Sequence, residues 1–302
     1  MSEDFPRRLF CFGLGYSALV LARELQTEGW AVAGTCREAD KVAVLAGEGI
    51  DAHRFDGATP LRDAMRALAG TTHVLISVPP DAEGDPVLHW HRHEITVLLH
   101  AVPRLAWLGY LSTTGVYGDR AGDWVDEASE RRPTGERGRR RVAAEDGWLA
   151  LWRDRGLPVH LFRLAGIYGP RRSALDTVRA GRAQRIDKPG QVFSRIHVAD
   201  IAAILRASMA RPRPGAAYNL CDDNPAPPEE VIRYACELLD VAPPPLVPFA
   251  RAELSPMARS FYDDNKRVRN ELIKSELGIR LRYPDYRAGL QALLHRDAPA
   301  PR

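Results

Sequence analysis

The first half of the chain alternates short apolar runs with amphipathic stretches. The apolar runs predict six β-strands, at residues 9–12, 31–35, 52–55, 74–78, 105–111 and 159–163. Between the first two, Leu21, Ala22 and Leu25 recur at helical spacing, and Gly29 follows as a residue that ends the helix. Alternation between period two and period 3.6 is typical of βαβ units. The pattern therefore predicts an α/β fold with a doubly wound parallel sheet.

The second half of the chain has fewer strand signals and more proline. Proline-rich joints occur at residues 212–214, 225–228 and 243–248, and helices are predicted at 200–210, 228–239, 266–277 and 286–294. We therefore expect a first domain over residues 1–169 and a smaller lobe over residues 170–302. Segments of the two are expected to interleave.

The composition is that of an ordinary globular protein, with 45% hydrophobic and 27% charged residues. This composition argues against a collagen-like chain, a coiled coil and a mostly disordered chain. The 42 basic and 39 acidic residues nearly cancel, so the charge predicts neither a nucleic-acid partner nor a membrane partner. No run approaches the roughly 18 apolar residues of a membrane helix, and the first residues, 1–4, begin acidic. We expect a soluble, cytoplasmic protein.

Cysteine and histidine spacing does not predict a metal site. The four cysteines have no CxxC pair, so they are expected to be buried free thiols: Cys11, Cys36, Cys221 and Cys236. Three histidines fall close together at positions 89, 91 and 93, but the zinc motif HExxH would need a histidine at Val97. The sequence therefore predicts that no metal is bound.

A glycine-rich loop follows the first predicted strand. Gly13, Gly15 and Ala18 fit the pattern G-x-G-x-x-A at the start of the first helix. In such a loop the first glycine makes a tight turn, the second lets the backbone approach a pyrophosphate, and the helix N-terminus attracts the anion. The loop, with Tyr16 and Ser17, predicts dinucleotide binding and a Rossmann fold. The alternative is a turn whose glycines are purely structural.

The residue after the second strand bears on the choice of cofactor. An acidic residue about 20 positions past the glycines would bind the ribose 2′-hydroxyl of NAD, but this chain has Arg37 there. A guanidinium suits the 2′-phosphate of NADP. We therefore expect NADP, with NAD as the alternative if Arg37 is merely exposed and Glu38 or Asp40 reaches the ribose.

Four further motifs make the sequence resemble a known family. They are Leu111-Ser112-Thr113-Thr114-Gly115-Val116-Tyr117-Gly118, Arg163-Leu164-Ala165-Gly166-Ile167-Tyr168-Gly169-Pro170, Arg195-Ile196-His197-Val198-Ala199-Asp200 and Tyr218-Asn219-Leu220. With the glycine loop, they resemble the extended short-chain dehydrogenase/reductases, and more narrowly the NAD-dependent epimerase/dehydratase group. The resemblance runs in order through nearly the whole chain. The remaining candidate cofactor contacts are Asp56, Ser77, Val78, Pro79 and Gly166.

The resemblance implies a catalytic pair that this chain lacks. In the family a hydroxyl at the position of Thr113 binds the substrate oxygen, while a tyrosine and a lysine one helical turn apart move the proton and hold the ribose. Alignment on Glu145 places Arg137 and Arg141 at those two positions. Arginine stays protonated, so Arg137 is no ordinary general acid or base, whereas Arg141 can still supply charge. The chain is therefore identified as an atypical member.

Two tyrosines are candidates for a replacement hydroxyl. They are Tyr117 and Tyr168, and the alternative for both is packing with a hydrogen-bonded phenol. His197 is a third titratable group in these motifs, and the resemblance implies a structural role for it.

Clustered arginines indicate the kind of substrate. Arg137 and Arg141 lie one helical turn apart, and the resemblance implies that Arg171, Arg172 and Arg195 border the same cleft. Guanidinium groups bind carboxylates and phosphates, so we expect a polar, anionic or nucleotide-linked small molecule.

The sequence therefore predicts an NADP-dependent oxidoreductase of atypical extended type. The alternatives are a catalytically inactive dinucleotide-binding sensor or complex subunit, and an NAD-dependent epimerase or dehydratase. The resemblance also suggests a homodimer.

Overall fold

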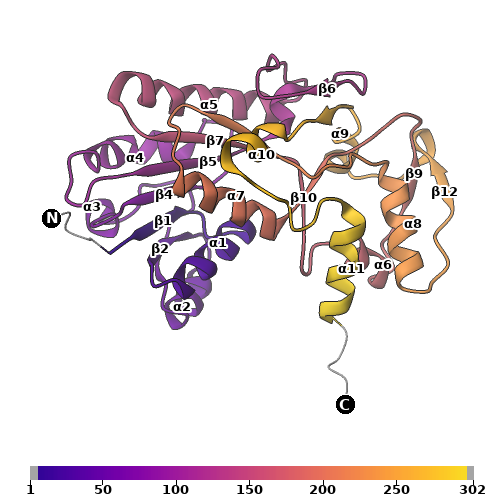
Figure 1. The fold of residues 1–302 in the computed structure, drawn as a ribbon, viewed down its shortest axis with the longest axis horizontal. Helices are drawn as coiled ribbons and strands as arrows, with labels where there is room; N and C mark the ends of the chain where they lie inside the picture. The colour runs from indigo at the N-terminus through magenta and orange to yellow at the C-terminus, as the bar shows by residue number, and fades with distance from the viewer. Residues whose placement is uncertain (1–5, 298–302) are drawn as a thin grey trace. The chain divides into compact units, whose positions relative to one another are not determined.

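The computed structural model describes residues 6–297, and the acidic N-terminal residues lie outside this range. Its central feature is a seven-stranded sheet of order β11-β7-β5-β4-β1-β2-β3 (Figure 1). The strands are β1 (Arg8–Phe12), β2 (Ala31–Cys36), β3 (Asp51–Arg54), β4 (His73–Ile76), β5 (Trp107–Thr113), β7 (Val159–Leu164) and β11 (Ala217–Leu220). The pairs β1–β2, β1–β4, β2–β3 and β4–β5 are parallel. The predicted parallel sheet is confirmed, and β11 is a seventh strand that the apolar pattern did not predict.

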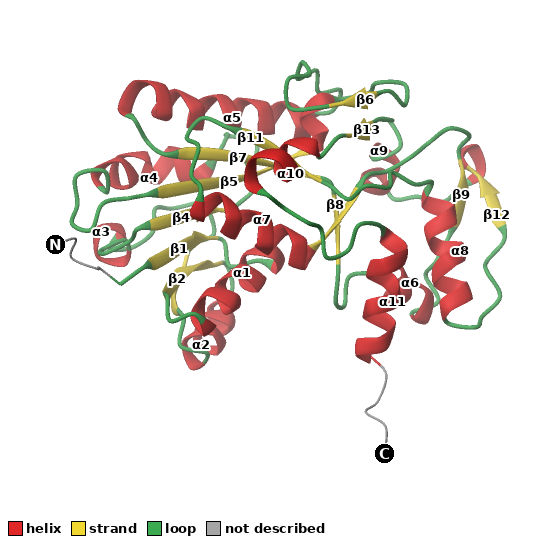
Figure 2. Cartoon of the chain, in the orientation of Figure 1, coloured by secondary structure: helices red, strands yellow, loops and turns green. Residues whose placement is uncertain are grey.

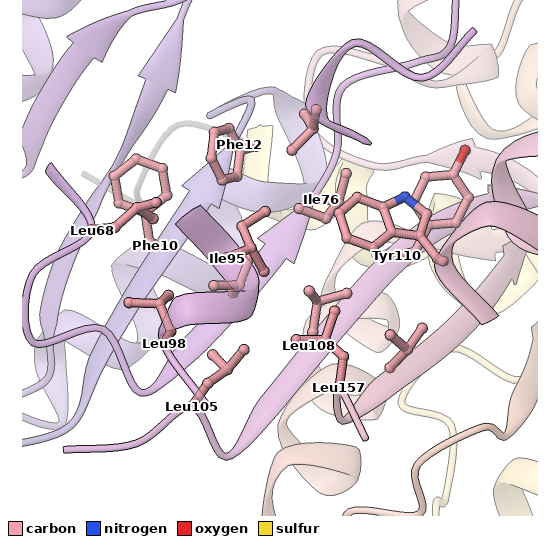
Figure 3. Packing of buried hydrophobic residues seen from close by; sticks show 14 of the residues in the cluster. Phe10, Phe12, Leu68, Ile76, Ile95, Leu98, Leu105, Leu108, Tyr110 and Leu157 are labelled. Carbon is pink, nitrogen blue, oxygen red and sulfur yellow. The ribbon is translucent and has the colours of Figure 1, made fainter. Parts of the chain in front are cut away.

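Helices cover both faces of this sheet. They are α1 (Tyr16–Thr27), α2 (Ala39–Gly47), α3 (Ala64–Ala67), α4 (Pro86–Val97), α5 (Glu136–Arg155) and α7 (Val198–Ala210). On one face, Phe10 and Tyr110 pack in a buried cluster with residues of α3, α4 and α5 (Figure 3). On the other, the indole of Trp107 donates to the hydroxyl of Ser208 in α7 (3.0 Å). The doubly wound arrangement predicted from the sequence is therefore present.

The end of α1 shows how local sequence sets these boundaries. Gly29 has φ +81°, a left-handed conformation that glycine adopts without strain. The amide of Trp30 then donates back to the carbonyl of Leu25 (3.1 Å). Leu21, Ala22 and Leu25 are buried, as predicted.

The chain forms two compact units that interleave along the sequence. Unit 1 comprises Met1–Thr113, Arg139–Arg163 and Ala202–Tyr218, and unit 2 comprises Thr114–Gly138, Leu164–Ile201 and Asn219–Arg302. Gly169, where the sequence predicts a division, lies within unit 2.

Short elements make up unit 2. They are η1 (Thr114–Tyr117), β6 (Trp124–Val125), β8 (Gly166–Tyr168), α6 (Ala174–Arg179), β9 (Arg185–Asp187), β10 (Arg195–His197), α8 (Pro228–Leu238), β12 (Leu246–Pro248), η2 (Phe249–Arg251), α9 (Pro256–Ser260), β13 (Arg267–Val268), α10 (Glu271–Leu277) and α11 (Tyr286–Asp297). Its strands form the parallel pairs β8–β10, β9–β12 and β6–β13, which Figure 2 shows as short arrows among loops. Buried side chains of α6, α8 and α11 form a core.

The predicted helix over residues 266–277 is wrong in its first part. Arg267 and Val268 form β13, and α10 begins only at Glu271. The buried side chain of Asn270 donates to the carbonyl of Cys221 (2.8 Å), which holds the chain in a non-helical turn. Long-range pairing here overrides the local helical pattern.

Two predictions from composition concern the described residues directly. All four cysteines are buried and unpaired, as expected. Within residues 6–297, every helix is too short or too polar to cross a bilayer.

Candidate functional site

Five neighbouring strands of unit 1 end at one edge of the sheet, and the candidate cofactor residues follow them. β1 leads into Gly13, β2 into Arg37, β3 toward Asp56 and β4 into Ser77, while β5 ends at Thr113. The strand order reverses between β1 and β4, because β3 connects to β4 across β1 and β2. Ligands of open α/β sheets bind at the carboxyl ends of strands at such a reversal.

The two glycines of the loop have different structural demands. Gly13 has φ +92°, and a Cβ there would lie 3.1 Å from Cγ2 of Val78. Its amide donates to the hydroxyl of Thr35 (2.9 Å). Gly15 has an ordinary φ of −88°, and a Cβ there would meet no atom within 4 Å. The fold therefore needs glycine at position 13, whereas at position 15 glycine leaves open space that suits a close-lying pyrophosphate.

The N-terminus of α1 completes this cradle. Gly15 is the N-cap residue of α1, and no side chain caps the helix there. The first turn also has no acidic residue, so the positive end of the helix dipole faces the loop without a competing carboxylate. Tyr16 opens the helix, and Ser17 and Ala18 are buried behind it. These residues fit a dinucleotide phosphate.

A lysine that sequence analysis missed lies beside the loop. Arg37 is exposed, and its guanidinium lies 3.9 Å from the Glu38 carboxylate. Four residues further, on α2, the ammonium of Lys41 donates to the carbonyl of Leu14 (2.8 Å). The available signal was a second cation in the first turn of the helix that follows β2.

The remaining candidate cofactor residues of unit 1 also follow strand ends. Asp56 accepts from the amide of Ala58 (3.0 Å) and lies 3.5 Å from the guanidinium of Arg54. Val78 lies against the loop at Gly13, and Pro79 beyond it is exposed.

The residue before Thr113, Ser112, belongs to a buried ionic network. The carboxylate of Glu145 on α5 is fully buried and accepts from the Ser112 hydroxyl (2.6 Å). The Arg163 guanidinium on β7 donates to both of its oxygens (3.1 and 2.9 Å). This network joins β5, α5 and β7 directly before the residue expected to bind the substrate oxygen.

The two arginines at the tyrosine and lysine positions have separate contacts. Arg141 donates to the Tyr110 hydroxyl (3.2 Å) and to the carbonyl of Leu111, which ties it to β5. The guanidinium of Arg137 lies 5.1 Å from the ring centre of Phe261. A paired clamp of Arg137 and Arg141 on one anion stays a prediction.

The candidate replacement hydroxyls have partners in unit 2. Tyr117 is buried, and its hydroxyl donates to Asn219 (2.7 Å). The Tyr168 hydroxyl donates to the carbonyl of Asp285 (3.3 Å), and burial raises its pKa above the ordinary value. Burial therefore disfavours loss of the phenolic proton of Tyr168.

The substrate-binding candidates of unit 2 line one cavity of about 540 Å³. Arg171 and Arg195 both contribute to it, and Arg195 pairs with Gly166 between β10 and β8. Arg172, Arg182 and Tyr286 also line this cavity. Sequence analysis missed Arg182 and Tyr286, which belong to no motif.

The histidine-rich stretch of α4 does not converge. His91 is buried and its Nε2 accepts from the amide of Leu61 (2.9 Å), whereas His89 and His93 are exposed. Among residues 6–297, no three histidine, cysteine, aspartate or glutamate side chains gather as metal ligands would.

Comparison with known proteins defines the fold class. A dTDP-glucose 4,6-dehydratase from Bacillus anthracis, solved in complex with NAD, is 16% identical over 96% of each chain, with a TM-score of 0.74. The chain therefore shares its fold with this dehydratase and with a UDP-glucuronic acid 4-epimerase from Bacillus cereus, as the motifs predict.

Two other proteins are similar in sequence. A conserved, functionally unknown protein from Silicibacter pomeroyi is 51% identical, with a TM-score of 0.86, over 96% of this chain and 99% of that one. The chain belongs to the same family as this protein. Protein YeeZ of Escherichia coli K12 is 28% identical over 92% of this chain and 97% of its own. No model of a known protein family matches the sequence.

Proposed function

We propose that this protein binds NADP at the carboxyl edge of its sheet and acts as an oxidoreductase on an anionic small molecule. The observation that carries the proposal is the open space at Gly15 beside the uncapped N-terminus of α1. The fold does not require glycine there, and the open space beside the helix N-terminus supports close approach of a pyrophosphate. A bound nicotinamide would supply or accept the hydride.

The preference for NADP over NAD rests on charge. Arg37 and Lys41 are two cations four residues apart, one in the bend after β2 and one in the first turn of α2. The Lys41 ammonium donates to Leu14, which fixes it beside the loop. A 2′-phosphate gains charge-assisted hydrogen bonds from such groups, whereas a 2′-hydroxyl gains little.

On the substrate side, we assign Thr113 the role of orienting a carbonyl or hydroxyl oxygen. It stands at the carboxyl end of β5, next to Ser112, whose hydroxyl is held by the buried Glu145. Arg171 and Arg195 would bind the negative charge of the substrate. Arg141 would hold the nicotinamide side of the cofactor, and Arg137 would bind negative charge on the substrate.

The second candidate is a dinucleotide-binding sensor or complex subunit without catalysis. It is favoured by the hydrogen bonds that engage the two candidate replacement hydroxyls. Tyr117 and Tyr168 both donate hydrogen bonds within unit 2. Arg137 cannot exchange a proton near neutral pH. The third candidate is an epimerase or dehydratase that uses NAD, the cofactor found in the complexes of similar fold.

Turnover separates these functions. We expect oxidation of NADPH in the presence of one member of a panel of phosphorylated or nucleotide-linked carbonyl compounds, followed by nicotinamide absorbance. Thr113→Val should abolish this turnover, and Thr59→Val, at an exposed loop position, should leave it unchanged. NADPH binding without turnover on any compound of the panel would favour the sensor. Conversion of a nucleotide-linked sugar without net loss of NADPH would favour the epimerase or dehydratase.

A further inference from the structure

The cavity of unit 2 is lined by more basic than acidic side chains. Four arginines line it: Arg171, Arg172, Arg182 and Arg195. Among the described lining residues, Asp176 is the single carboxylate, and it is engaged in the capping box of α6, where it accepts from the amide and hydroxyl of Ser173. The lining of the cavity therefore has more guanidinium groups than carboxylates.

Arg195 is the innermost of these cations. Its Nη1 donates to the carbonyls of Phe193 (2.8 Å) and Ala226 (3.1 Å), which fixes the guanidinium. Burial lowers its pKa. Asp222 attracts it from beyond ion-pair distance, and burial raises the pKa of Asp222. A half-buried guanidinium with no carboxylate within ion-pair distance favours an anionic ligand.

Part of the cavity lining is apolar. Val231 and Ile232 of α8 and Tyr286 and Leu290 of α11 line it, and the Arg195 guanidinium lies 6.0 Å from the Tyr286 ring centre. The cavity volume of about 540 Å³ lies within the range of small-molecule sites. Bare phosphate would leave this apolar lining unused.

We infer that this cavity binds a phosphate ester with an apolar or aromatic body, with its phosphate on Arg195, Arg171 and Arg182. Several arginines match the charge of a phosphate dianion better than that of a carboxylate. The inference rests on the proposed function in taking this ligand to be the substrate. The binding itself needs no dinucleotide, so the two fail separately.

Calorimetric titration of the full chain with phenyl phosphate, inorganic phosphate and benzoate tests the inference. Phenyl phosphate should bind one site per chain, roughly tenfold or more tighter than either of the other two. Arg171→Gln/Arg182→Gln should weaken phenyl phosphate roughly tenfold or more, since both side chains are exposed cations at this cavity. Arg251→Gln removes one exposed charge from unit 2 outside the cavity and should have little effect.

A further variant separates this cavity from the glycine loop. Gly15→Ala should leave phenyl phosphate affinity unchanged while it weakens NADP. Loss of phenyl phosphate binding in Gly15→Ala, or unchanged binding in the double arginine variant at an unchanged melting temperature, would overturn the inference. Equal affinity for benzoate would overturn the assignment to a phosphate.

Discussion

The ammonium group of Lys41 donates a hydrogen bond to the main-chain carbonyl of Leu14, 2.8 Å away. Leu14 lies between the two glycines of the loop, so the first turn of α2 is tied to the proposed phosphate site. A lysine in this place serves two ends, because it fixes the loop and adds positive charge beside it. Arg37 lies four residues earlier, in the bend before α2.

Replacing Lys41 with methionine should lower the affinity for NADP while it affects NAD much less. A charge-assisted hydrogen bond contributes about 1.5–3 kcal/mol, which corresponds to a loss of roughly tenfold or more. Arg37→Gln should act in the same direction, and Arg62→Gln, an exposed arginine before α3, provides the control. Calorimetric titration gives the affinities. An equal loss for NADP and NAD would mean that Lys41 only shapes the loop.

The variant Gly15→Ala tests whether glycine is needed at this position for ligand binding or for folding. The variant should fold with an unchanged melting temperature, because a Cβ at residue 15 meets no atom within 4 Å and φ is ordinary. Dinucleotide affinity should fall roughly tenfold or more, since the added methyl occupies the path of the pyrophosphate. Gly47→Ala at the end of α2, where a Cβ also meets nothing, should leave affinity unchanged. Full dinucleotide affinity in Gly15→Ala would contradict the placement of the phosphates.

Breaking the buried pair of Glu145 and Arg163 should strongly destabilise the protein. Glu145→Ala leaves a buried guanidinium without its carboxylate, which costs about 3–5 kcal/mol of unfolding free energy. The double variant Glu145→Met/Arg163→Met should lose less, because no charge remains buried. Glu48→Ala removes a bidentate partner of Arg23 near the surface and should cost at most about 1 kcal/mol. Urea unfolding measures all three, and equal losses for Glu145→Ala and Glu48→Ala would contradict the account.

Most of the sheet could be predicted because its strands are apolar runs bounded by turn residues. β11 could not be predicted, since it has only four residues and one of them is the polar Asn219. It becomes a strand by lying beside β7 in the sheet. The glycine loop and Arg37 follow from a local motif, whereas Lys41 gains its meaning from a contact with Leu14, 27 residues away. Arg182, in the turn after α6, and Tyr286, at the start of α11, line the same cavity. No local sequence pattern encodes this proximity.

Two buried histidines should make the protein sensitive to acid. His73 and His160 both have ring contacts with Trp107, and burial lowers the pKa of each from 6.5 to about 4. The unfolded chain therefore takes up protons first as pH falls below 6.5. The stability that each neutral ring provides is complete above pH 6.5 and is lost as pH falls from there to about 4, at most about 3 kcal/mol per histidine.

Urea unfolding of the wild type and His160→Gln from pH 7 to pH 4 measures this loss. Glutamine does not titrate, so the stability advantage of the wild type over the variant should shrink as the pH falls. His89→Gln, at an exposed position, should follow the wild type throughout. A constant difference between wild type and His160→Gln across this range would contradict the assignment.

We propose that the glycine loop binds a dinucleotide and that the cations after β2 select NADP. Calorimetric titration of the wild-type protein with NADP and with NAD measures both. We predict one site per chain and an affinity for NADP roughly tenfold or more above that for NAD. Absence of binding by both dinucleotides would contradict the cofactor site, and equal or tighter binding of NAD would contradict the role of Arg37 and Lys41.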